Sequence, residues 1–171
     1  MAWREEAKRR VALEAVKHVK DDFIIGLGSG STAAYVIQEL GEKIRHEGLR
    51  ILGVPTSHQA MMLAVHYGIP LTTLNEHPEL DLAIDGADQV DRELNLIKGG
   101  GGALTREKIV ASAAKQFVIV ADETKLVERL GTKHPVPVEV LPFALPIVVA
   151  KMRELGGKPV LREGKGKVGP V

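Results

Sequence analysis

The chain has 171 residues, a formal net charge of +1 and no cysteine. The near balance of charge gives no electrostatic reason to expect nucleic acid or a membrane surface as a partner, and the lack of cysteine excludes disulfides and a thiol nucleophile. Its apolar stretches fall short of the ~20 residues that a membrane helix needs, and the N-terminus is too charged for a secretory signal, so we expect a cytoplasmic protein.

Hydrophobic periodicity predicts helices and strands that alternate along most of the chain. The alternation is typical of an α/β fold, a Rossmann-like open, mostly parallel sheet with helices on both faces. The predicted elements in chain order are helix 4–20, strand 23–27, helix 32–46, strand 50–54, helix 57–67, strand 70–74, strand 80–84, helix 103–114 and strand 117–121.

The composition of the chain changes after Gly131, where prolines become frequent. Here the pattern predicts strand 136–140, a helix ending near 155–157, strand 159–162 and a loop at 165–169. We therefore predict two domains, a Rossmann-like domain over 1–131 and a small second domain over 132–171.

Groups able to transfer protons are concentrated between Asp85 and Glu107. The segment Asp85-Gly86-Ala87-Asp88 follows the predicted strand 80–84, and Lys98 precedes four consecutive glycines. Open α/β sheets bind ligands beyond the carboxyl ends of their strands, so this constellation favours proton transfer on a small anionic substrate. Taken singly, the glycines could instead be structural and the aspartates could be capping residues.

The position of Glu107 on its predicted helix points to a catalytic base. A 3.6-residue period places Glu107 on the apolar arc with Val110 and Ala111, away from the polar side. Burial disfavours the charged form of a carboxyl group and raises its pKa, which suits a base near neutral pH. A solvated glutamate, or one paired with Arg106 or Lys108, is the alternative.

A glycine-rich loop follows the predicted strand 23–27 and opens the next helix. Backbone N–H groups and the helix dipole make such a loop an anion site, and Ser29, Ser31 and Thr32 add hydroxyl donors. The spacing lacks the third glycine of a dinucleotide fingerprint and does not match a Walker loop. The loop therefore suits a single phosphate better than a nucleotide, although a tight turn without a ligand would have a similar sequence.

These segments resemble the signature motifs of the type A ribose-5-phosphate isomerase family, in family order and spacing. Small departures are Gln89, where the family usually has glutamate, and Gly102, where alanine is common. Because the family continues well beyond the last residue, the resemblance implies that the second domain is only partly represented. The motifs are 26–32, 85–88, 98–101, 103–108, 119–125 and 137–140.

The resemblance implies that the chain interconverts ribose 5-phosphate and ribulose 5-phosphate through an enediol, in the non-oxidative pentose phosphate pathway. Glu107 would move the proton, Lys98 would stabilise the enediolate, and Asp85 or Asp88 would handle a hydroxyl proton or ring opening. The loop 29–32 would hold the phosphate or the terminal hydroxyls, which stays open. The implied substrate-binding residues are Ser29, Gly30, Ser31, Thr32, Asp85, Gly86, Ala87, Asp88, Lys98, Gly99, Gly100, Gly101 and Lys125.

Other expectations concern cofactors, partners and alternative functions. The six histidines show no metal-ligand spacing, so we expect no metal, and the resemblance implies no cofactor. The partner would be a small sugar phosphate, and the chain would form a homodimer or homotetramer. Two alternatives are an amino-sugar-phosphate isomerase or deaminase and a non-catalytic sugar-phosphate sensor. The sensor is disfavoured because it has no use for a base.

Overall fold

The structure, a computed structural model, describes residues 2–162. The chain divides into two compact units, Met1–Pro137 and Val138–Val171, so the division falls six residues beyond the boundary that we predict. None of the helices in the described part is long and apolar enough to cross a membrane.

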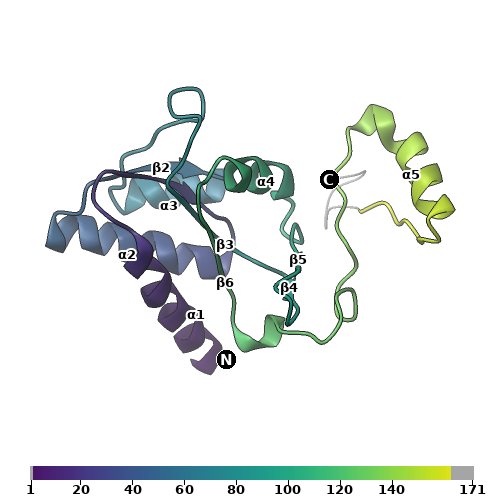
Figure 1. The fold of residues 1–171 in the computed structure, drawn as a ribbon, viewed down its shortest axis with the longest axis horizontal. Coiled ribbons are helices and arrows are strands. Elements are labelled where there is room, and N and C mark those ends of the chain that lie inside the picture. Colours follow the sequence, from purple (N-terminus) through teal and green to yellow (C-terminus); the bar gives the residue numbers. More distant parts are fainter. Residues whose placement is uncertain (1, 163–171) are drawn as a thin grey trace. The chain divides into compact units, whose positions relative to one another are not determined.

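The first unit is built on a four-stranded parallel sheet with the order β2-β1-β3-β6 (Figure 1). Its strands are short apolar runs with mostly buried residues, as expected when both faces of a parallel sheet are covered. This sheet confirms the predicted fold class. The strands are β1 (Phe23–Leu27), β2 (Ile51–Pro55), β3 (Leu82–Gly86) and β6 (Phe117–Val120).

Helices cover both faces of the sheet. The larger core cluster packs α1, α2 and α3 against one face, with Ile25, Leu40 and Ile84 among its buried members. The smaller cluster includes Val110 of α4 and packs on the other face, and Figure 1 shows α4 opposite α1 and α2. The helices are α1 (Ala2–Ala15), which continues into η1 (Val16–His18), α2 (Ser31–Glu47), α3 (His58–His66) and α4 (Leu104–Ser112).

A small antiparallel hairpin, β4 (Gln89–Val90) with β5 (Leu96–Ile97), lies between β3 and α4 in the chain and was not predicted. Two-residue strands are too short to show alternation. The Asp91 carboxylate stabilises the turn because it accepts hydrogen bonds from the backbone N–H groups of Glu93 and Asn95, each at 2.9 Å. The hairpin brings Lys98 back towards the end of β3.

Three predicted strands are wrong. Over 70–74 only Leu71 pairs, in a single parallel bridge to Gly53 at the sheet edge. The described residues of 136–140 and 159–162 form no strand. Prolines at 135, 137 and 159 cannot donate to a ladder. The second unit contains η3 (Pro142–Ala144) and α5 (Leu145–Glu154), and the predicted loop 165–169 lies outside the described residues.

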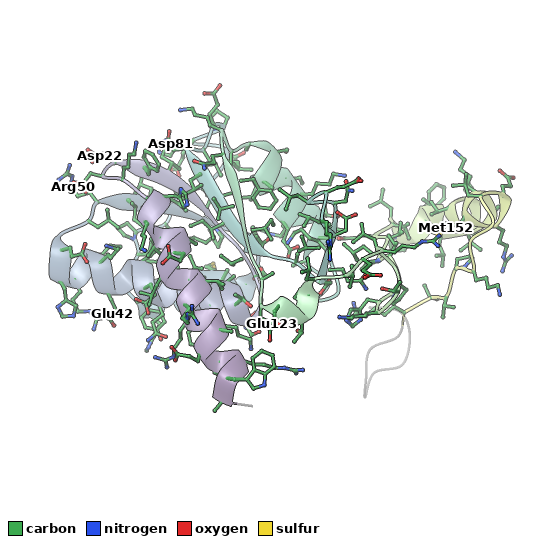
Figure 2. All side chains as sticks on the ribbon, turned by 60° about the horizontal axis from the view of Figure 1, so that its bottom comes forward. Asp22, Glu42, Arg50, Asp81, Glu123 and Met152 are labelled. Carbon is green, nitrogen blue, oxygen red and sulfur yellow. The ribbon has the colours of Figure 1, made fainter. Side chains whose placement is uncertain are left out.

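Charged side chains form hydrogen bonds and ion pairs at the amino end of the sheet. Arg50 donates two hydrogen bonds to the carboxylate of Asp22, at 2.9 and 3.0 Å, and Asp81 accepts from the N–H of Ile24 at 3.0 Å. Figure 2 shows Asp22, Arg50 and Asp81 together at this end, and Glu123 at the other. These charges are satisfied within the fold, whereas the candidate catalytic residues gather at the carboxyl end.

Candidate active site

The carboxyl ends of β1 and β3 form the switch point of the sheet. The chain leaves β1 through α2 towards β2, and it leaves β3 through α4 towards β6 on the other side. Connections that diverge in this way open a crevice between two neighbouring strands, where α/β proteins bind ligands. The loops 28–31 and 86–88 border this crevice.

Asp85 is a buried anchor at this crevice, with 3% of its surface exposed. It lies inside β3, and not in the turn after the strand as we predicted. Its Oδ1 accepts hydrogen bonds from the backbone N–H groups of Ser29, at 3.0 Å, and Gly86, at 2.7 Å. A Cβ at position 28 would lie 2.3 Å from this oxygen, so Gly28 is required for the close approach of the two strands.

Lys98 joins the two carboxylates of the site. Its Nζ lies 3.1 Å from Oδ2 of Asp85 and 3.2 Å from Oε2 of Glu107, and it donates a hydrogen bond to the carbonyl oxygen of Gly86. These two carboxylate oxygens are buried, and neither receives a well-aligned hydrogen bond from the described residues. The ammonium therefore holds the two carboxylates together by electrostatic attraction.

Glu107 lies in the first turn of α4 and is 7% exposed. Burial raises the pKa of Glu107, and the charges of Asp85 and Asp88 raise it further, while the Lys98 ammonium opposes them; the net direction is upward. The predicted burial and raised pKa are therefore confirmed. Gly26 allows α4 to pack this closely on β1, because a Cβ there would lie 2.5 Å from Val110 Cγ1.

Part of the apolar environment of Glu107 is a cleft of about 280 Å³ beside Lys98. The cleft walls near Glu107 are hydrocarbon, from Leu104 and Ala111 of α4 and Phe117 of β6. Hydrocarbon walls cannot solvate a carboxylate, which explains why desolvation dominates its pKa.

Asp88 and the glycine run form the rim of the site. Oδ2 of Asp88 accepts a hydrogen bond from the N–H of Gly100 at 2.7 Å. The loop turns through Gly99 and Gly102, whose φ angles of 96° and 84° favour glycine. This hydrogen bond joins the glycine run to Asp88 in this conformation.

The loop after β1 contributes the N-terminus of α2. The Ser29 hydroxyl is hydrogen-bonded within the fold: it lies 2.7 Å from the Thr56 hydroxyl and donates to that of Ser57 at 2.6 Å. Ser31 is exposed, and Gly30 gives the helix no side-chain cap among the described residues. Sequence reasoning missed Thr56, whose hydroxyl donates to the carbonyl of Leu27 at 3.0 Å, because no motif marks it.

The structure does not join Lys125 to the other site residues. Lys125 is half-buried in η2 (Glu123–Lys125), just beyond β6, and the described residues give it no hydrogen bond or ion pair with Asp85, Lys98 or Glu107. Its charge acts instead on Asp122, a buried carboxylate that sequence reasoning did not select. No group of three or more potential metal ligands occurs within residues 2–162.

The family model for ribose 5-phosphate isomerase A (phosphoriboisomerase A) matches residues 52–171. The chain belongs to this family. The ribose-5-phosphate isomerase A of Methanosarcina acetivorans is 60% identical over 164 residues, which cover 96% of this chain and 69% of that protein. The solved structure of the Methanocaldococcus jannaschii ribose 5-phosphate isomerase A superposes with a TM-score of 0.94 at 54% identity, covering 98% of this chain and 75% of that one.

Proposed function

We propose that this chain interconverts D-ribose 5-phosphate and D-ribulose 5-phosphate through an enediol, in the non-oxidative pentose phosphate pathway. The observation that carries the proposal is the Lys98 ammonium, placed 3.1 Å from Asp85 and 3.2 Å from a buried Glu107. A base with a raised pKa beside a fixed cation is what an enediolate intermediate requires.

Glu107 is the base of the proposed reaction. Its carboxylate removes the proton from C2 of the open-chain aldose, and the electron pair forms the C1–C2 double bond while the carbonyl oxygen becomes an enediolate. The same carboxyl group then returns a proton to C1, while the hydroxyl at C2 becomes the ketone and its proton passes to the oxygen on C1. Asp88 is better placed than Asp85 to exchange that hydroxyl proton, because Asp85 is 3% exposed whereas Asp88 is only partly buried.

Lys98 stabilises the negative charge that develops on the enediolate oxygen. Its position is fixed before substrate binds, because the Gly86 carbonyl and two carboxylates already surround it. A preorganised charge in a water-poor site contributes more than the same charge in water. Asp85 keeps the ammonium in place, since its Oδ1 is fully occupied by two backbone N–H groups.

The N-terminus of α2 is the proposed anion subsite. Ser31 and Thr32 lie at its first turn, where free N–H groups and the helix dipole favour a phosphate. Lys125, which lies just beyond β6, adds positive charge at the carboxyl end of the sheet. Whether the loop holds the phosphate or the terminal hydroxyls is tested by comparing competitive inhibition by inorganic phosphate with that by unphosphorylated ribose.

The decisive experiment follows ribose 5-phosphate in deuterated water by proton NMR. Isomerisation through an enediol replaces the proton at the exchanging carbon with deuterium, and ribulose 5-phosphate accumulates with or without a chelator. The Glu107→Gln variant is the matched control, because it removes the base and keeps the side-chain shape. A sugar-phosphate sensor would bind without exchange, and an amino-sugar-phosphate enzyme would leave ribose 5-phosphate unchanged.

We also propose a homodimer or homotetramer in the cytoplasm, with domains 1–131 and 132–171. Exposed apolar side chains support the association, including Met62 and Val65 of α3, which are 56% and 61% exposed. Light scattering measures the mass of the assembly. Cell fractionation identifies the compartment, and limited proteolysis locates the domain boundary. A monomer at micromolar concentration would contradict the assembly.

A further inference from the structure

Gln89 is a fully buried polar residue that the proposed chemistry does not use. It is 0% exposed, and it is the only polar residue among the largest fully buried side chains of the described part. Its Oε1 accepts a hydrogen bond from the backbone N–H of Gly131 at 2.8 Å, and its Nε2 lies 3.4 Å from the carbonyl of His134. A buried amide is costly unless it is hydrogen-bonded, so this contact has a defined role in the fold.

The hairpin register places Gln89 opposite Ile97, the residue before the catalytic lysine. Gln89 pairs with Ile97, and the N–H of Asp88 donates to the carbonyl of Ile97 at 2.8 Å. Because successive side chains of a strand point to opposite faces, Asp88 and Lys98 project to one face of the hairpin and Gln89 to the other. The proposed catalytic groups and the buried Gln89 amide therefore lie on opposite faces of one small hairpin.

The segment 126–134 contacts the hairpin along the outer edge of β4 and through the Gln89 side chain. Val90 forms a parallel bridge with Leu126, and the N–H of Val127 donates to the carbonyl of Val90 at 2.9 Å. The Gln89–Gly131 hydrogen bond extends this backing beyond the bridge. Gly131 has a φ of 84°, a conformation that side chains disfavour, and its added Cβ would meet no atom within 4 Å.

We propose that Gln89 is a positioning residue, whose side-chain carbonyl holds the N–H of Gly131 and thereby keeps the Lys98 ammonium between Asp85 and Glu107. A two-stranded hairpin of this size is marginal by itself, so its placement depends on what backs it. The inference rests on the proposed isomerase chemistry and assigns a role to a residue that never touches the substrate.

The position of Lys98 can be read in the pH profile. The groups that act on Glu107 are Asp85, at the end of β3, Asp88, before β4, and Lys98, after β5; the two aspartates raise its pKa and the lysine lowers it. If the hairpin moves Lys98 away, the pKa of Glu107 rises further. The acidic limb of kcat/KM then moves to higher pH, an effect that a loss of stability alone does not produce.

The test compares Gln89→Met with Gln89→Glu. Methionine keeps the length of the side chain but lacks the acceptor oxygen, whereas glutamate keeps it. We expect Gln89→Met to lose roughly 10–10²-fold in kcat, the scale of small misplacements of catalytic groups, and to shift the acidic limb upward. Gln89→Glu should stay within about threefold of wild type in kcat. The acidic limb of its kcat/KM profile should lie at the same pH as in wild type.

Gly131→Ala tests the other end of the hydrogen bond. It strains the backbone at φ 84°, and Gly48→Ala at φ 72°, beyond the C-terminus of α2, is the matched control with equally open space. Gly131→Ala should shift the acidic limb and Gly48→Ala should not, although both lower the melting temperature. The Gln89→Met and Gly131→Ala effects on kcat should be less than additive, because they break the same contact.

Amide exchange separates this inference from the proposed function. The Gly131 N–H should exchange faster in Gln89→Met and not in Gln89→Glu, whatever reaction the protein catalyses. A wild-type chain without isomerase activity would end the proposed function. An active wild type, with a Gln89→Met variant that keeps its kcat and its acidic limb, would overturn the positioning role alone, as would equal losses in both Gln89 variants. If Gln89→Met does not fold, the shift of the acidic limb in Gly131→Ala, compared with Gly48→Ala, tests the positioning role.

Discussion

Replacing Glu107 by glutamine should cost activity while leaving the fold at least as stable. Positioned bases contribute about 10²–10⁴-fold in rate, so kcat should fall by at least the lower figure. Glutamine has nearly the same shape, and the substrate and Lys98 keep their places. Binding of ribose 5-phosphate should therefore persist.

The stability effect follows from the charges in the site. Ionised Asp85, Lys98 and Glu107 sum to a net charge of −1, with both carboxylates buried, and glutamine at position 107 makes the group neutral. Because the pKa of Glu107 is raised in the folded state, its contribution to stability is present at low pH and is lost as pH rises through that pKa. An increase of about 1 kcal/mol in the free energy of unfolding, which is ordinary for a point mutant, would raise the Tm of Glu107→Gln by about 2–4 °C.

Asp122→Asn is the matched comparison, because Asp122 is also a buried carboxylate. Burial raises the pKa of Asp122, but hydrogen bonds from the N–H and hydroxyl of Thr124, with the charges of Lys125 and Arg4, outweigh it and lower the pKa. Its stabilising contribution is present at neutral pH and is lost as pH falls through the lowered pKa. Asp122→Asn should therefore lower Tm at pH 7.

Thermal melts across pH 4 to 8, with the isomerase assay in parallel, measure both effects. The Tm difference between Glu107→Gln and wild type should shrink towards low pH, where wild-type Glu107 is protonated. Near-normal turnover in Glu107→Gln would refute the assignment of the base. A clear loss of Tm in that variant at neutral pH would refute the reasoning that ionised Glu107 is a cost to the fold.

Three further substitutions test the rest of the site. Lys98→Ala should lower kcat by roughly 10²–10³-fold, the scale of one lost oxyanion donor; a higher KM with unchanged kcat would assign Lys98 to ground-state binding instead. Gly28→Ala should lower stability by about 1–3 kcal/mol through overpacking and also abolish activity, because its Cβ would meet Asp85; Gly53→Ala crowds the Leu27 side chain at 2.6 Å and should keep its kcat. Ser31→Ala should raise the KM for ribose 5-phosphate and weaken inhibition by inorganic phosphate without changing kcat, and an unchanged KM would place the phosphate elsewhere.

The sequence by itself determined the α/β class, the four sheet strands and the place of the site. These follow from local patterns, namely short apolar runs and a 3.6-residue period that buries Glu107. The patterns hold because each element must bury one face, so its own residues carry the information. The raised pKa of Glu107 followed from the same burial.

Only the tertiary structure decided how the candidate catalytic groups meet. Lys98 reaches Asp85 and Glu107 through a hairpin too short to show a period, and the Gln89–Gly131 contact joins residues 42 positions apart. The same dependence explains the wrong strands at 136–140 and 159–162, because a strand exists only where a partner completes its hydrogen bonds. Local sequence specifies which residues can be extended or helical; long-range packing decides which of them are paired.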